Sequence, residues 1–247
     1  MSDVPPSHPR YVSLRCRDAI VAGVDKGITS AHGLIAHGRG EALDYLIGER
    51  TRPFARQAAR AAAALLLLAE RPVISVNGNV AALVAVEMVE LGRVLGAPLE
   101  INIFHASKAR ERKMKKHLLE NGATQILMPS TKAELSFIDS QRRFVHPEGI
   151  FTADVVFVPL EDGDRCEALR KMGKKVVVVD LNPLSRTARK ANIALVDNVV
   201  RAVPVLIEEI GKAKKKSTKA LKRVVDAYDH RQVLGAAEQC LRRGGRA

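Results

Sequence analysis

Tryptophan is absent from this sequence of 247 residues, and aromatic residues make up only 4% of it. Because 47% of the residues are nonetheless hydrophobic, the core must consist of Val, Leu, Ile and Ala, a composition typical of parallel strands covered by helices. The longest apolar run, at 61–69, is far shorter than the roughly 18–20 residues of a membrane span. The first ten residues contain no apolar signal region. We therefore expect a cytoplasmic protein that makes no membrane contact.

Cysteine is scarce as well. Cys16, Cys166 and Cys240 are far apart and form no CxxC pair, so neither a zinc site nor a disulfide framework is indicated. Two phosphate-binding fingerprints, GxGxxG and GxxxxGK[ST], are also missing. The chain is therefore neither a standard NAD-binding unit nor a P-loop enzyme.

Positive charge is abundant but unevenly distributed. The formal net charge is +13, and residues 212–247 hold 11 Lys and Arg against 3 Asp and Glu. This basic segment could bind phosphates or could be the solvated face of a helix. The lack of interleaved aromatic residues favours a solvated helix, so we do not expect nucleic acid as a partner.

The pattern of hydrophobic residues changes along the chain, from helical segments to alternating strands and helices. Residues 13–27 have helical periodicity, a Gly-rich stretch follows at 33–49, and Thr51 with Pro53 opens a further helix that runs to about Glu70. From residue 72, helix-length segments separate short β-branched strands, which are expected at 73–76, 99–104, 125–128, 154–158, 176–179 and 193–196. Residues 129–149 have little pattern.

Strands joined by helix-length connections pair in parallel through right-handed crossovers. We therefore predict an α/β fold, a Rossmann-like doubly wound and mostly parallel sheet with an N-terminal helical segment and C-terminal helices. The expected parts are a helical segment packed on the body at 1–71, a nucleotide-binding body at 72–211 and a basic helical extension at 212–247.

Ligands of such sheets bind beyond the carboxyl ends of the strands, and polar residues follow nearly every predicted strand. His105 follows the second strand, and Asp197 with Asn198 follows the last. The most informative point is 180–188, the loop DLNPLSRTA after the strand VVVV. We expect a nucleotide there, with Asp180 and Asn182 on the ribose or base. Ser185, Arg186 and Thr187 open a short helix that could bind the phosphates.

Two other loops at strand ends allow more than one interpretation. In Asn77, Gly78 and Asn79, the glycine permits close approach of a ligand, and Asn79 could cap a helix whose N-terminal amides attract phosphate. The same residues also suit an ordinary tight turn. The carboxylates of the loop at 159–165 could hold Mg²⁺ beside a nucleotide, or the loop could be a solvated acidic turn. They are Glu161, Asp162 and Asp164.

The segment AHGRGEA at 36–42 is distinctive in the N-terminal part. Gly38 and Gly40 leave the guanidinium of Arg39 accessible, and arginine suits a planar, bidentate grip on phosphate. His37 could assist or could be structural. Arg17 is a second early arginine with few reasons to be buried.

Several segments together resemble one family. HPRY, LIAHGRGEALDYLIGE, PVISVNGNVAALV, DLNPLSRTA and VDNVVRAVP occur in the order typical of the archaeal phosphopantothenate synthetases, or 4-phosphopantoate–β-alanine ligases. The resemblance implies a Rossmann-like homodimer of coenzyme A biosynthesis that uses ATP, and we expect Mg²⁺ to accompany the nucleotide. It would convert 4-phosphopantoate, β-alanine and ATP into 4′-phosphopantothenate, AMP and pyrophosphate. The implied ATP contacts are Arg17, Arg39, Asp180, Leu181, Asn182, Arg186, Thr187, Asn198 and Val199.

AMP as a product implies an acyl-adenylate, whose formation builds charge on phosphate oxygens. We expect Arg39 and Arg186 to stabilise that charge, and our hypothesis for the base is His37. Asn77, Gly78 and Asn79 would bind the acid substrate. Two alternatives stay open, a non-catalytic nucleotide- or RNA-binding α/β protein and a ligase for another acid.

Overall fold

The fold is built on one parallel sheet. The computed structural model describes residues 4–104 and 107–245. Six parallel strands lie in the order β3-β2-β1-β6-β7-β8, which confirms the Rossmann-like, doubly wound prediction. Their bounds are Pro72–Val76 for β1, Leu99–Ile101 for β2, Ile126–Leu127 for β3, Val155–Pro159 for β6, Lys175–Val179 for β7 and Ile193–Leu195 for β8. The strand order reverses between β1 and β6, and ligands of such folds bind at this reversal.

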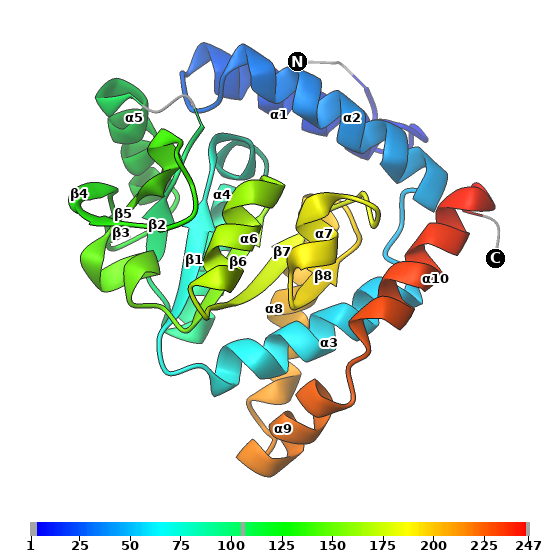
Figure 1. Ribbon diagram of the computed structural model, residues 1–247. Coiled ribbons are helices and arrows are strands. Elements are labelled where there is room, and N and C mark those ends of the chain that lie inside the picture. Colours follow the sequence, from blue (N-terminus) through cyan, green and yellow to red (C-terminus); the bar gives the residue numbers. More distant parts are fainter. Residues whose placement is uncertain (1–3, 105–106, 246–247) are drawn as a thin grey trace.

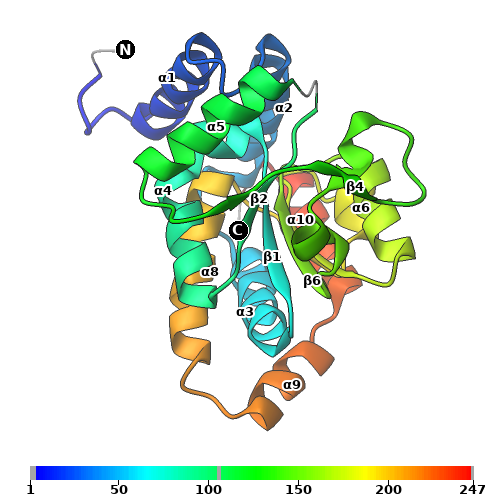
Figure 2. The ribbon, with the colours of Figure 1, turned by 90° about the vertical axis from the view of Figure 1, so that its left-hand side faces the viewer.

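Helices cover both faces of the sheet (Figures 1 and 2). On one face, α3 (Pro53–Leu68), α4 (Gly78–Leu95), α5 (Lys108–Glu120) and α8 (Val199–Ala213) share a hydrophobic cluster with alternate strand residues such as Ile74 and Val177. On the other face, α6 (Gly163–Lys171) and α7 (Arg186–Lys190) pack against Val176 and Val178. The valines of β7 are therefore buried on both sides, as expected for a central parallel strand.

The helices α1 (Tyr11–Asp25) and α2 (Ala31–Ile47) cross the top of the molecule in Figure 1, above the carboxyl ends of the strands. Most of the Gly-rich stretch at 33–49 lies in α2. This helix is capped at its C-terminal end by Gly48, which has the left-handed conformation that favours glycine. This position makes α2 a wall of the space beyond the strand ends.

Residues 129–149, which lack a clear sequence pattern, form a small excursion beside the sheet. The antiparallel pair β4 (Ser130–Glu134) and β5 (Phe144–Val145) flanks the short 3₁₀ helix η1 (Gln141–Arg143), and a π-helical turn, η2 (Pro147–Phe151), follows. The buried carboxylate of Glu100 accepts the backbone amides of His146 at 2.8 Å and Ile150 at 2.7 Å. Burial raises the pKa of Glu100 above its ordinary value, and these two amides attach the turn to β2.

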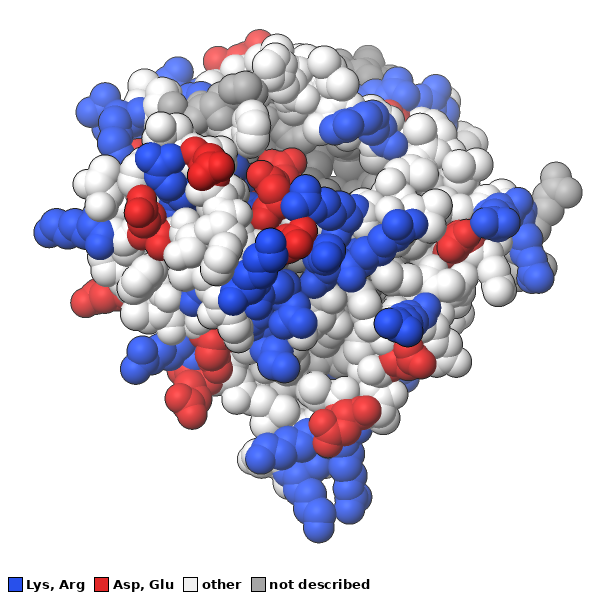
Figure 3. All heavy atoms as spheres, in the orientation of Figure 1, with Lys and Arg blue, Asp and Glu red and all other residues white. Residues whose placement is uncertain are grey.

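The C-terminal helices α9 (Thr218–Asp226) and α10 (His230–Arg242) pack on α3. Leu221, Val233 and Ala237 are buried in the same cluster as Ile74 of β1, so the segments predicted at 1–71, 72–211 and 212–247 share one core. Lys and Arg side chains gather at the lower end of the face in Figure 3, where α9 lies. None of the described helices is long and apolar enough to span a membrane.

Candidate functional site

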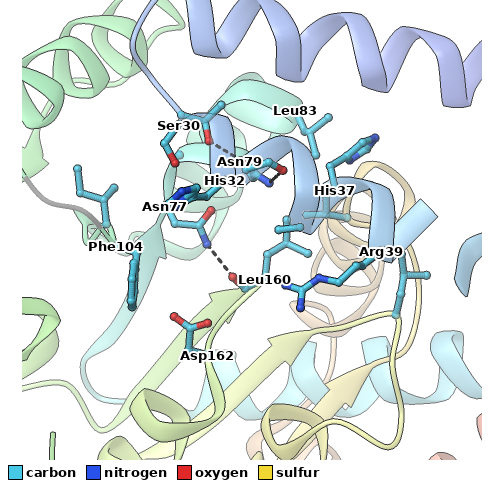
Figure 4. A pocket seen from close by; sticks show the side chains of 18 of the residues that line it. Ser30, His32, His37, Arg39, Asn77, Asn79, Leu83, Phe104, Leu160 and Asp162 are labelled. Atoms are coloured by element: carbon cyan, nitrogen blue, oxygen red, sulfur yellow. Dashed lines mark hydrogen bonds between the residues drawn. The ribbon is translucent and has the colours of Figure 1, made fainter. Parts of the chain in front are cut away.

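A cavity of about 380 Å³ opens between α2 and the carboxyl ends of the strands (Figure 4). The residues after β1 and β6 line its floor, so the cavity lies at the reversal of strand order. Predicted site residues that line it are His37, Arg39, Asn77, Gly78, Asn79, Asp162, Leu181, Asn198 and Val199. The structure thus brings together residues from five separate parts of the sequence.

Asn77 joins the two strands that meet at the reversal. Its amide nitrogen Nδ2 donates to the carbonyl oxygens of Pro159 at 2.9 Å and Leu160 at 3.0 Å, and its Oδ1 accepts the backbone amide of Val80 at 3.1 Å. Asn77 is therefore the N-cap of α4, and the suggestion that Asn79 caps this helix is wrong. Asn79, two residues further on, donates from its side-chain amide to the carbonyl oxygen of Gly33 at 3.0 Å, which attaches α4 to α2.

Gly78 has a specific steric role at this contact. A Cβ atom built on Gly78 would lie 2.8 Å from the carbonyl oxygen of Ile28, in the segment that precedes α2. The absence of a side chain therefore lets the chain pass directly over the first turn of α4. The N-terminal end of α4, which carries the positive end of the helix dipole, lies at the cavity.

The α2 wall contributes Arg39 and His37 (Figure 4). The side chain of Arg39 is exposed. The Nε2 atom of His37 is buried and has no hydrogen-bond partner. Burial lowers the pKa of His37, which favours the neutral imidazole, the form that can accept a proton.

Arg17 reaches this wall from α1. Its Nε donates to the Glu41 carboxylate at 2.9 Å, and its Nη2 donates to the Tyr45 hydroxyl at 3.4 Å. Burial opposes ionisation of Glu41, but the hydrogen bonds from Arg17 and Tyr45 hold the pKa of this carboxyl below its ordinary value. Glu41 itself lines the cavity, so Arg17 is held at its edge rather than inside it.

The loop after β7 is mostly occupied with its own structure. Leu181 lines the cavity, whereas the Asp180 carboxylate accepts the Asn182 backbone amide at 2.9 Å and the Ser185 hydroxyl. Burial raises the pKa of Asp180. Asn182 accepts the backbone amide of Leu184 at 3.0 Å. Asp180 and Asn182 therefore shape the loop that presents Leu181, and their contacts with a nucleotide remain predictions.

Arg186 and Thr187 lie away from the cavity lining. The Arg186 guanidinium donates to the Glu167 carboxylate at 2.8 Å, and this bond is the main reason why the pKa of Glu167 falls to about 2. Thr187 donates from its hydroxyl to the carbonyl oxygen of Glu161 at 2.8 Å. Their predicted contacts with phosphate are likewise not tested by this geometry.

The three carboxylates of the acidic loop differ in their surroundings. The Glu161 side chain is fully buried and ion-paired with Arg142 and Arg165. Burial opposes its ionisation, but the two guanidinium groups hold the pKa of Glu161 below its ordinary value. Asp162 lies at the cavity, 2.8 Å from Nη1 of Arg142, and Asp164 is exposed. Across residues 4–104 and 107–245, no three His, Cys, Asp or Glu side chains are grouped so that they could hold a metal ion.

Two arginines of the cavity were missed by the sequence analysis. Arg142 comes from the excursion at 129–149, where its Nε donates to the side-chain oxygen of Asn102 at 2.9 Å. Arg110 comes from the first turn of α5 and donates to the carbonyl oxygen of Ile28 at 3.3 Å. No local motif marks either residue, since distant partners position both. His105, predicted to follow the second strand, lies outside the described residues.

Comparisons with known proteins point to one family. The family model described as phosphopantothenate/pantothenate synthetase matches residues 54–244. The 4-phosphopantoate–β-alanine ligase of Methanosarcina mazei is 49% identical over 237 residues, which cover 96% of this chain and 93% of the relative. The ligase of the same name from Thermococcus kodakarensis is 52% identical over 235 residues, or 95% of this chain and 90% of the relative. The one from Methanospirillum hungatei is 48% identical over 200 residues, with 81% and 82% covered.

Proposed function

The chain belongs to the phosphopantothenate/pantothenate synthetase family, and from this we propose that it is an ATP-dependent ligase that joins 4-phosphopantoate to β-alanine. The reaction yields 4′-phosphopantothenate, AMP and pyrophosphate and belongs to coenzyme A biosynthesis. The observation that carries the proposal is that relatives named for this reaction align with almost the whole chain. The cavity at the reversal of strand order supports it, because nucleotides bind at such points.

The lining of the cavity fits ATP. Leu181 and Val199 offer apolar surface at one side, and Arg39 offers a guanidinium for phosphate oxygens. The first turns of α4 and α8 supply backbone amides. ATP therefore binds between α2 and the ends of β7 and β8, with its phosphates toward α4.

The first chemical step is attack of the phosphopantoate carboxylate on the α-phosphorus of ATP, which expels pyrophosphate. The β-alanine amine then attacks the acyl-adenylate and expels AMP. Arg39 stabilises the charge that develops on phosphate oxygens in both steps. Neutral His37 accepts the proton that the amine loses, and Asn77, Gly78 and Asn79 hold the acid substrate at the centre.

Mg²⁺ bound together with ATP would supply positive charge beside the phosphate oxygens, and a carboxylate at the cavity would help to hold it. Asp162 is the carboxylate of the acidic loop that lines the cavity. Glu161 is committed to Arg142 and Arg165. We therefore assign a direct or water-mediated metal contact to Asp162 ahead of Glu161 and Asp164.

We also propose a homodimer. Apolar side chains remain exposed on α1 and α2, among them Val12, Val21, Leu34 and Ile35, the last with 66% of its surface accessible. Large apolar side chains left exposed on two neighbouring helices support a face that another chain covers. Sedimentation of the wild type and of Ile35→Glu tests this, and a wild type that sediments as a monomer refutes it.

The test of the function is exchange of labelled pyrophosphate into ATP. We expect exchange that requires 4-phosphopantoate but not β-alanine, and AMP release that requires both. The variant Arg39→Ala tests the role of Arg39 in the same assays. Its matched control is Arg93→Ala, since Arg93 pairs with Glu90 at the C-terminal end of α4. Ligation without any exchange would refute an adenylate that releases pyrophosphate early. Equal turnover of other hydroxy acids would refute phosphopantoate as the specific substrate.

A further inference from the structure

Behind the nucleotide side of the cavity, an arginine bridges two buried carboxylates. We propose that Arg201 is a positioning residue for ATP, because with Asp44 and Asp197 it fixes helix α2 to the start of α8. This inference rests on the proposed function. Arg201 does not line the cavity, whereas Asn198 and Val199 at the start of its own helix do.

The bridge has well-defined geometry. The Arg201 guanidinium donates to Asp197 Oδ1 through Nε at 2.9 Å and Nη2 at 2.6 Å. It also donates to Asp44 Oδ2 through Nη1 at 3.1 Å, and to Asp44 Oδ1 through Nη2. Asp44 is 5% exposed and Asp197 is 1% exposed, so solvent screens these contacts little. One planar guanidinium therefore holds two carboxylates that would otherwise repel each other.

The same carboxylates orient the residues of the site. Asp44 Oδ2 accepts Nδ2 of Asn198 at 2.8 Å, and Asp197 Oδ1 accepts the backbone amide of Asn198 at 2.8 Å. Thr51, in the link between α2 and α3, donates to Asp197 Oδ2 at 2.6 Å. Asn198 is thus fixed through its side chain by α2 and through its backbone by the loop before α8.

This arrangement determines which way the Asn198 amide points. Because Asp44 can only accept, the NH₂ group of Asn198 must face it, and its Oδ1 faces the amide of Val200 at 3.3 Å, as an N-cap. On the α2 side, Arg39 lies less than two turns before Asp44. Arg201 therefore sets the spacing between the α2 wall and the α8 wall of the cavity.

Arginine has the right shape for this role and lysine does not. A guanidinium presents several N–H groups in a fixed fork, whereas an ammonium is a single point charge on a flexible stem. Arg201→Lys keeps the charge but cannot span both carboxylates in the same plane. The walls are then held by fewer hydrogen bonds, and the cavity loses its preorganised shape.

The test measures ATP affinity of the full-length protein by calorimetry and the two Michaelis constants by steady-state ligation. For Arg201→Lys we expect the Kd and the KM for ATP to rise about tenfold, as loss of one or two charged hydrogen bonds implies, while the KM for β-alanine stays unchanged. Asp44→Asn keeps the shape of the side chain and is expected to shift the same two constants. The matched control is Arg93→Lys, whose bidentate partner Glu90 lies at the far end of α4.

The outcomes separate positioning from simple stabilisation. If Arg201 only stabilises the fold, both variants lower the Tm but bind ATP with wild-type affinity below the transition, and this result overturns the inference. If Arg201→Lys does not fold, Asp44→Asn decides. A wild type that binds no ATP would refute the proposed function as well, whereas wild-type ATP affinity in both variants refutes only the role of Arg201.

Discussion

Glu161→Gln is expected to destabilise the protein strongly, because Glu161 lies between two buried guanidinium groups. Its side chain and that of Arg165 are fully buried, and Arg142 is 5% exposed. The amide leaves both positive charges close together, with Arg165 deprived of its ion pair and Arg142 left with the half-exposed Asp162. Breaking a buried pair by removing one partner costs about 3–5 kcal/mol. At about 2–4 °C per kcal/mol for a chain of this size, the Tm should fall by roughly 6–20 °C.

The assay is thermal unfolding followed by circular dichroism or calorimetry, over a range of pH. The pKa of folded Glu161 lies below the ordinary value of 4.5. A carboxyl whose folded pKa is lowered contributes stability above its unfolded pKa, and this contribution is lost as the pH falls through the folded pKa. The difference in Tm between wild type and variant should therefore be constant at neutral pH and shrink as the pH falls below 4.5.

Asp162→Asn is the matched control, because Asp162 contacts the same Arg142 at 2.8 Å but its side chain is 54% exposed. An exposed pair contributes about 0–1 kcal/mol, so this variant should unfold near the wild-type Tm. A Glu161→Gln protein within about 2 °C of the control would refute the reasoning. If the Tm of Glu161→Gln differed from that of the wild type only in the presence of Mg²⁺, Glu161 would instead be identified as a metal ligand.

Three further predictions concern the site and its surroundings. Arg39→Ala should lower kcat/KM for ligation by about 10²–10³ with an unchanged Tm, and full activity would remove Arg39 from the mechanism. ATP at about 100 times its Kd should stabilise the wild type by about 2.7 kcal/mol, measured as a rise in Tm; no rise would contradict nucleotide binding. Burial lowers the pKa of His230, which contacts the carbonyl oxygen of Ala188 at 2.9 Å. Its contribution to stability is therefore present above pH 6.5 and lost as the pH falls below it, so His230→Gln should unfold with a weaker pH dependence in that range.

The sheet could be predicted because its signals are local. Four consecutive valines in β7 and the regular alternation with helices define central parallel strands. The excursion at 129–149 could not be predicted in the same way. Its strands are short and irregular, and it is held by the buried side chains of Glu100 and Arg142, whose partners are distant in sequence. Tertiary contacts of this kind leave no periodic pattern.

In the candidate site too, features with a local sequence signal could be predicted, and those that depend on tertiary contacts could not. Asn77, Gly78 and Arg39 were found because polar or glycine residues at strand ends and in an unusual glycine-flanked segment stand out. The sequence also shows three carboxylates in the acidic loop, but it does not show that one of them, Glu161, is ion-paired with Arg142 and Arg165. Nor could it show which asparagine caps α4, since either residue beside the glycine has the required side chain.

The position of α2 requires a glycine at 33, where the helix passes the first turn of α4. Glycine in a helix interior costs about 1 kcal/mol relative to alanine, so Gly33, Gly38 and Gly40 weaken α2 as an isolated helix. A Cβ on Gly33 would lie 2.3 Å from Oδ1 of Asn79, a contact that would push α2 away from the first turn of α4. Gly40 lies against Leu181, with 3.5 Å from its built Cβ to the leucine methyl. Gly33 therefore allows α2 to approach α4 closely, whereas a Cβ on Gly40 would make an ordinary contact and a Cβ on Gly38 would meet nothing within 4 Å.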